Sequence, residues 1–139
     1  MKWTKNGEVL WCRLELGEEV MSGLSEFLEA AGVKSGTLIA IGALKDTELG
    51  YLDVEKGEYQ RHTFAEEMEL IQFTGNVTTV DGKPFVHAHA VIAGADFIAR
   101  AGHFFQGTVA VTFECQLFAG ELKLGRSFDE ATGLKLIDL

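Results

Sequence analysis

The chain has 139 residues, of which 47% are hydrophobic, and a formal net charge of −9 at pH 7. This length predicts one domain, residues 1–139, with enough apolar material for a single core. No stretch approaches the ~20 apolar residues that span a bilayer, and the N-terminal segment lacks an apolar signal-peptide core, so we expect a cytoplasmic protein without membrane contact. An acidic surface also repels DNA. The 12 Lys and Arg residues are scattered, and only "YQRH" (59–62) and "KLGRSF" (123–128) approach clusters, which makes direct DNA binding doubtful.

The N-terminal part predicts a strand followed by a helix. Residues 9–16 alternate in polarity as in a half-buried strand, with one face formed by Leu10, Cys12, Leu14 and Leu16. A helix is predicted from about Glu18 to Ala31, because apolar residues recur there at helical spacing, namely Val20, Met21, Leu24, Phe27, Leu28 and Ala31. Gly32 can cap its C-terminal end. We interpret this helix as core packing without a functional role.

The next segments predict a central strand and a hairpin. Residues 36–44, "GTLIAIGAL", form a continuous apolar run typical of a buried strand. Residues 47–54 alternate in polarity and end in a turn signal at residues 55–57. Residues 58–64 can complete this hairpin as its second strand.

The C-terminal half is dominated by strand patterns. Residues 68–80 and 84–92 flank an Asp81-Gly82 turn, so they predict an antiparallel hairpin. Residues 107–118 form another β-branched and aromatic run, and the tail, 121–139, is mixed. The whole pattern predicts an α+β fold with a largely antiparallel mixed sheet of about seven strands and one main amphipathic helix.

The two cysteines and the absence of common motifs narrow the possible chemistry. Cys12 and Cys115 each lie in an apolar strand-like run and lack C-x-x-C spacing, so we expect small buried residues and no disulfide. The sequence contains no G-x-S-x-G, no G-x-x-x-x-G-K-[ST] and no G-x-G-x-x-G. Any catalysis would therefore depend on a metal or a carboxylate.

Three of the four histidines fall within a short apolar part of the chain. His87 and His89, in "PFVHAHAVI", are one residue apart on a predicted strand, so their side chains project to the same face. The segment between His89 and His103 is long enough to hold a loop and return the chain beside the first strand. Three imidazoles leave one position of a tetrahedral ion open for water or a ligand, and nitrogen ligands favour zinc, with copper, nickel and iron as alternatives.

Other interpretations of these polar residues stay open. An H-x-H pair is often two hydrogen-bonded histidines with no metal, and His62 has charged neighbours typical of an exposed strand. Glu69 and Glu114 could each orient a ligating imidazole. Glu114, inside "VTFECQL", could instead pair with a cation or simply face outward. Glu69 and Glu114 are the only carboxylates that we would name as a general base for a metal-bound water.

Six ordered blocks of the chain carry a family resemblance that covers roughly residues 8–137. The chain resembles the plants-and-prokaryotes-conserved (PPC) domain in its free-standing prokaryotic form, on the segments "IAIGAL", "GYLD", "EEMELIQFTGNV", "DGKPFVHAHAVI", "AGHFFQGTVAVTFE" and "GLKL". The resemblance implies a mixed α/β domain with a largely antiparallel sheet that assembles as a homotrimer. It also implies a metal, usually zinc, on His87, His89 and His103, although here the prokaryotic Gly-Gly-His-Leu block reads Ala-Gly-His-Phe.

Three hypotheses about function follow from the sequence. The first is a trimeric metal-binding protein whose metal presents an open position to an unidentified small-molecule ligand. The second is a DNA-associated regulatory protein, as the label often given to prokaryotic relatives implies. The plant relatives owe their DNA contacts to a separate AT-hook, and this chain has no Arg-Gly-Arg-Pro or basic arm. The third is a metal-dependent enzyme of unknown substrate.

Overall fold

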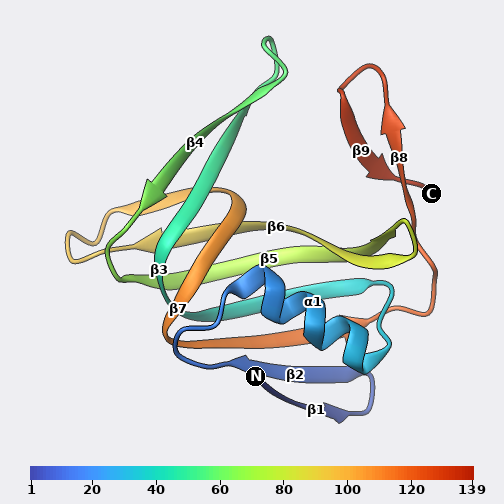
Figure 1. The fold of residues 1–139 in the computed structure, drawn as a ribbon, viewed down its shortest axis with the longest axis horizontal. Coiled ribbons are helices and arrows are strands. Elements are labelled where there is room, and N and C mark those ends of the chain that lie inside the picture. The colour runs from blue at the N-terminus through green and yellow to red at the C-terminus, as the bar shows by residue number, and fades with distance from the viewer.

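The fold is described by a computed structural model that covers residues 1–139. Seven strands form one antiparallel sheet in the order β1-β2-β7-β6-β5-β3-β4, and β8 and β9 form a separate hairpin (Figure 1). The elements are β1 (Lys2–Asn6), β2 (Val9–Leu14), α1 (Val20–Ala31), β3 (Gly36–Asp53), β4 (Glu58–Phe64), β5 (Met68–Val80), β6 (Lys83–Ala93), β7 (Ala99–Ala119), β8 (Arg126–Asp129) and β9 (Leu134–Ile137). The predicted α+β fold, with a mainly antiparallel sheet and a single helix, is confirmed.

Strands β3 and β7 close part of the sheet on itself. In addition to its sheet neighbours β4 and β5, β3 pairs with β7, so β7, β6, β5 and β3 form a continuous ring. Three fully buried rings, those of Phe73, Phe104 and Phe113, pack edge to face with centroids 5.0 and 5.3 Å apart. Each such ring contributes about 1.5–3 kcal/mol by leaving water, so this cluster, with one ring from β5 and two from β7, helps to hold these two strands of the ring together.

Helix α1 covers the sheet through its apolar stripe. It packs against β2, β6 and β7, with Val20, Leu24, Phe27 and Leu28 buried, which agrees with its predicted packing role. The helix begins at Val20, two residues later than expected, because the Glu19 side chain accepts hydrogen bonds from the backbone N–H groups of residues 21 and 22 and caps the first turn. Gly32, with φ of 69°, ends the helix as predicted. At 12 residues, α1 lacks the length and apolar character of a membrane-crossing helix.

Strand β3 differs from its prediction because it is one long strand. The segments 36–44 and 47–54, predicted as separate strands, are joined through Lys45 and Asp46 by irregular pairing with β7. Asp46 has a positive φ of 51°, so a left-handed residue bends the strand without ending it. This bend allows β3 to pair with β5 in its first half and with β4 in its second half.

The predicted hairpins are present, and two further segments are longer or more ordered than expected. Asp81 and Gly82 both have positive φ, 52° and 79°, as a two-residue turn between β5 and β6 requires. β7 begins at Ala99, well before the predicted residue 107, and the mixed tail forms the β8–β9 hairpin. Strand β2, predicted over residues 9–16, ends at Leu14. The prediction that Leu16 shares its buried face is wrong, because Leu16 is 71% exposed.

Candidate metal centre

Strand β6 places His87 and His89 on one face of the sheet. Between and beside them, Val86, Ala88 and Ala90 are buried in the core, so the alternation of a strand directs both imidazoles away from it. On the neighbouring strand β5, Asn76 lies opposite His87 and Thr74 lies opposite His89.

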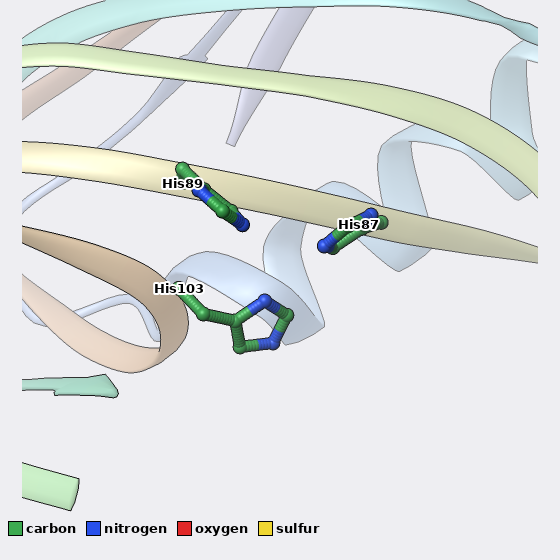
Figure 2. A group of neighbouring side chains, drawn as sticks. All are labelled: His87, His89 and His103. Atoms are coloured by element: carbon green, nitrogen blue, oxygen red, sulfur yellow. The ribbon is translucent and has the colours of Figure 1, made fainter. Parts of the chain in front are cut away.

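Strand β7 brings His103 to the same place. The chain leaves β6 at Ala93 and returns at Ala99, and the two strands then pair so that His103 lies directly opposite His89. Phe104, the next residue, is 1% exposed in the core, which turns His103 to the outer face. Figure 2 shows the three rings converging from β6 and from the curved first part of β7.

The three imidazoles form a compact cluster. One nitrogen of each of His87, His89 and His103 lies within 4.8 Å of the others, and the ring centroids are 5.3, 5.1 and 5.5 Å apart. A tetrahedral zinc with Zn–N bonds of about 2.0–2.1 Å needs nitrogens about 3.4 Å apart. Small side-chain rotations would bring these nitrogens to that spacing, so the donor set and its geometry suit one divalent transition metal.

The environment of His87 and His103 favours their neutral form. Burial is the main cause that lowers the pKa of His103 to about 4, and His87, His89 and the guanidinium of Arg61 act in the same direction. Burial also lowers the pKa of His87, with Arg126 and His89 as further causes. Only the neutral imidazole can bind a metal ion, so both residues are in the competent form at pH 7.

The polar atoms of the cluster lack protein partners. None of the three histidine side chains makes a hydrogen bond, and Nδ1 of His103 is buried with no partner at all. A buried nitrogen without a partner costs free energy. A bound ion would therefore remove an unsatisfied polar group from the fold as well as gain three ligands.

Two aromatic rings and one arginine lie beside His103. The ring of Tyr59, on β4, lies 5.1 Å from that of His103, and the ring of Phe105 lies 4.6 Å from it. The Arg61 guanidinium lies over the Phe105 ring, with Cζ 3.6 Å from the ring centroid. The β3–β4 hairpin therefore supplies one side of the site.

A second arginine stands on the His87 side and comes from the other end of the chain. Arg126, at the start of β8, donates from Nη2 to Asn76 Oδ1 (2.6 Å) and from Nε to Thr78 Oγ1 (2.8 Å). Its Cζ lies 5.2 Å from the centroid of the Phe85 ring. Because Asn76 is the register partner of His87, Arg126 lies beside the histidine cluster.

The carboxylates proposed from the sequence are not part of this cluster. Glu69 lies opposite Ala93 on β6, four residues and about 13 Å along the strand from His89. Glu114 lies where β7 pairs with β2 and β3, is exposed, and accepts a hydrogen bond from Thr112. Both line a shallow hollow beside Ile41 and Val111, and neither accepts a hydrogen bond from a histidine. This agrees with the outward-facing interpretation of Glu114.

The fourth histidine lies apart from the other three. His62 is exposed on β4, as predicted, and its ring packs 4.5 Å from that of Phe64.

The sequence singled out the histidines but missed the residues around them. Tyr59, Arg61, Phe105 and Arg126 all approach the cluster. The two segments that came nearest to basic clusters, "YQRH" and "KLGRSF", contain both arginines. Their composition was therefore a signal, although nothing in it showed that both would fold onto the histidines.

A match to a known family model covers most of the chain. The model of the Plants and Prokaryotes Conserved (PCC) domain matches residues 1–123. The chain belongs to this family. The resemblance seen in the six sequence blocks is thereby confirmed, and the β8–β9 hairpin with Arg126 lies beyond the matched residues. No protein of curated function matches the chain.

Solved structures of similar fold cover nearly the whole of this PCC-domain chain. A plant- and prokaryote-conserved protein from Pyrococcus horikoshii is 30% identical, with a TM-score of 0.87 and coverage of 99% of this chain and 94% of that one. A metal-containing protein from Archaeoglobus fulgidus is 35% identical, with a TM-score of 0.86 and coverage of 95% and 94%. A proposed DNA-binding protein from Bacteroides thetaiotaomicron is 24% identical, with a TM-score of 0.94 and coverage of 99% and 96%, and supports the fold.

Proposed function

We propose that this PCC-domain protein binds one divalent transition metal, zinc in the first instance, through His87, His89 and His103. The observation that carries the proposal is the convergence of three imidazoles from two strands, with nitrogens within 4.8 Å of one another. The unpartnered Nδ1 of buried His103 supports it, as does the metal content of the similar Archaeoglobus fulgidus protein. Imidazole ligands without carboxylate or thiolate favour zinc over magnesium or calcium.

Three protein ligands leave a position for a small molecule. Structural zinc sites are closed by four protein ligands, whereas sites that act on a ligand keep one position open. The charged side chains that act on His87 and His103, apart from the histidines themselves, are Arg126 and Arg61, which cannot act as ligands, and His89 is exposed. The function that fits best is therefore the binding of a small ligand at a metal whose fourth position stays exchangeable.

We also propose that the protein works as a homotrimer. The outer face of the sheet exposes several large apolar side chains, among them Ile41 (59%), Ile71 (55%) and Val111 (66%). Isolated domains seldom leave such neighbouring groups in water, and a further copy of the chain would cover them. Light scattering should give the mass of three 15.2 kDa chains, and the Val111→Glu variant should shift the mass toward one chain. A monomeric wild type at micromolar concentration would refute trimer formation.

The two alternative functions have less support from the site. A hydrolytic enzyme would need a base near the metal, and Glu69 and Glu114 lie outside the histidine cluster. A DNA-associated role is suggested by the proposed DNA-binding protein of similar fold, but that likeness is one of fold.

Metal retention tests the proposed function directly. Purified protein without an affinity tag would be loaded with zinc, dialysed, and its zinc per chain measured by mass spectrometry. Wild type should retain one zinc per chain, and His89→Ala, which removes one of three ligand bonds, should retain little. His62→Ala is the matched control, because His62 is also exposed but lies outside the cluster, and it should retain zinc like wild type. Equal zinc in wild type and His89→Ala would refute the site.

A further inference from the structure

Resting on the proposed metal site, we propose that its small ligand carries an oxyanion, a carboxylate or a phosphate group, which Arg61 and Arg126 bind beside the metal. The two arginines come from distant parts of the chain, β4 and β8, and stand on opposite sides of the three histidines. Two positively charged side chains thus approach a cluster of histidines that holds no negative charge. This observation points to a negatively charged small ligand.

Arg126 is fixed in place but keeps hydrogen-bonding capacity. Its Nε and Nη2 donate to Thr78 and Asn76, and its Nη1 donates to the carbonyl oxygen of Lys135. A guanidinium has five N–H groups in a planar fork, so two of them remain for a ligand. All three acceptors are neutral, and the positive charge of Arg126 is therefore not compensated by any partner it contacts.

Arg61 is held against an aromatic ring that itself touches the cluster. Its Cζ lies 3.6 Å from the centroid of Phe105, whose ring lies 4.6 Å from that of His103. Nη1 donates to Glu48 Oε1 at 3.3 Å, a long contact that uses one of the five N–H groups. The side chain remains 52% exposed, so its other donors can reach a ligand.

The charge around the cluster is positive in a strongly acidic protein. The chain has 21 acidic residues and a net charge of −9, yet the charged groups that act on His87 and His103 are arginines and other histidines, with no carboxylate among them. A divalent ion held by three neutral nitrogens would add two further positive charges. An anion at the open position would neutralise part of this charge and accept charge-assisted hydrogen bonds from the guanidinium groups.

The arrangement also explains why the ligand should be small. The single oxyanion of a small molecule would meet mainly the positive charge at the cluster, whereas duplex DNA would bring its phosphates against the acidic remainder of the surface. The β8–β9 hairpin lies beyond residues 1–123, which the family model matches. Arg126 is thus a specificity residue supplied by a segment outside the matched domain.

Cobalt-substituted protein provides a direct test. Cobalt(II) bound by nitrogen ligands absorbs visible light, and its spectrum changes when a ligand enters or leaves the open position. Cobalt-loaded wild type would be titrated with inorganic phosphate and with acetate, and Arg61→Gln and Arg126→Gln would be compared with Arg13→Gln. Arg13 is an exposed arginine paired with Glu15 away from the site. We expect about a tenfold or larger loss of anion affinity in each site variant, no loss in Arg13→Gln, and partial recovery in Arg126→Lys.

The readouts separate failure of this inference from failure of the metal site. Cobalt content of every arginine variant should equal that of wild type, because no arginine is a metal ligand. Retained cobalt with no spectral response to either anion, or with equal responses in wild type, Arg61→Gln and Arg126→Gln, would overturn the oxyanion proposal and leave the metal site standing. Wild type that retains no cobalt would overturn both. Arg61 makes a single long side-chain hydrogen bond, so its replacement should disturb the fold little. Arg61→Gln therefore tests the proposal even if Arg126→Gln loosens the β8–β9 hairpin.

Discussion

His89 and His103 lie directly opposite each other on the antiparallel strands β6 and β7, with ring centroids 5.5 Å apart. Opposite residues of a ladder project to the same face, so this register decides whether the third imidazole joins the first two. A shift of β7 by one residue would turn His103 into the core and bring Phe104 to the surface. The histidine cluster therefore depends on the pairing of two strands as much as on the three side chains.

Gly102 provides a test of this dependence. A Cβ atom at this position would lie 2.7 Å from the backbone oxygen of Gly50 on β3, closer than van der Waals contact allows. Gly102→Ala should force β7 away from β3 and displace His103. We expect a loss of about 1–3 kcal/mol in the free energy of unfolding, measured by denaturant titration, and weaker zinc retention. Ala101→Ser, an added atom on the exposed neighbour, should change both by little, and equal stability of the two variants would contradict the prediction.

The buried state of His103 predicts a pH dependence of stability in metal-free protein. Its pKa is lowered to about 4 in the fold, whereas an unfolded chain has a histidine pKa near ~6.5. Below pH ~6.5 the unfolded chain binds a proton that the native protein does not, so stability present above this pH is lost progressively as the pH falls toward 4.

Thermal melts with a chelator at pH 7 and pH 5 would measure this effect. For a half-buried ring we expect a loss on the order of 1 kcal/mol, or a few degrees in Tm. His103→Gln, which cannot titrate, is the comparison, because the carboxylates titrate equally in both proteins. If the melting temperature of the variant fell with pH as steeply as that of wild type, His103 would not be the cause.

Much of the candidate site was predictable because strand geometry is regular. The one-residue spacing of His87 and His89 fixes a shared face wherever the segment is a strand. To predict that His103 joins them, it was enough to assume that the chain turns back within a short loop. In contrast, Arg126 meets Asn76 across 50 residues of sequence, and no local pattern encodes which face a C-terminal hairpin will cover. The sequence shows that the segment around Arg126 is basic, but it does not show where this segment lies in the fold.

The misassigned elements have similar physical causes. Lys45 and Asp46 interrupt the apolar run of β3 like a turn, but the left-handed conformation of Asp46 and pairing with β7 carry the strand through them. Glu69 and Glu114 are charged residues inside strand patterns, and this position suggested a role at the metal site. Strand alternation was equally consistent with exposure, and only the three-dimensional pairing separated the two possibilities.

The two cysteines should be inert in the native protein. Cys12 and Cys115 lie opposite each other on β2 and β7 as free, buried thiols. Burial is the main cause that raises the pKa of each to about 12, so neither is a thiolate at pH 8. We expect no reaction with a thiol reagent over minutes at pH 8 and two thiols per chain after denaturation. Fast labelling of the native protein would show that this part of the core opens.

The distribution of charge predicts weak binding to duplex DNA. Non-specific affinity for DNA comes largely from phosphates that Lys and Arg neutralise. The chain has only 12 such residues against 21 acidic ones, and Lys2, Arg13, Lys56, Arg61 and Arg100 already pair with carboxylates. At ~150 mM salt the Debye length is about 8 Å. Distant cations therefore add little to the attraction between an arginine and a DNA phosphate, whereas nearby carboxylates still repel that phosphate.

We expect a dissociation constant weaker than ~100 μM, at the weak end of non-specific binding, by fluorescence anisotropy with a labelled AT-rich duplex. Zinc-loaded and metal-free protein should behave alike in this assay, because a single ion adds few phosphate contacts. Submicromolar binding at this salt concentration would make DNA association the leading function of the protein and would require a basic surface formed only in the assembled oligomer.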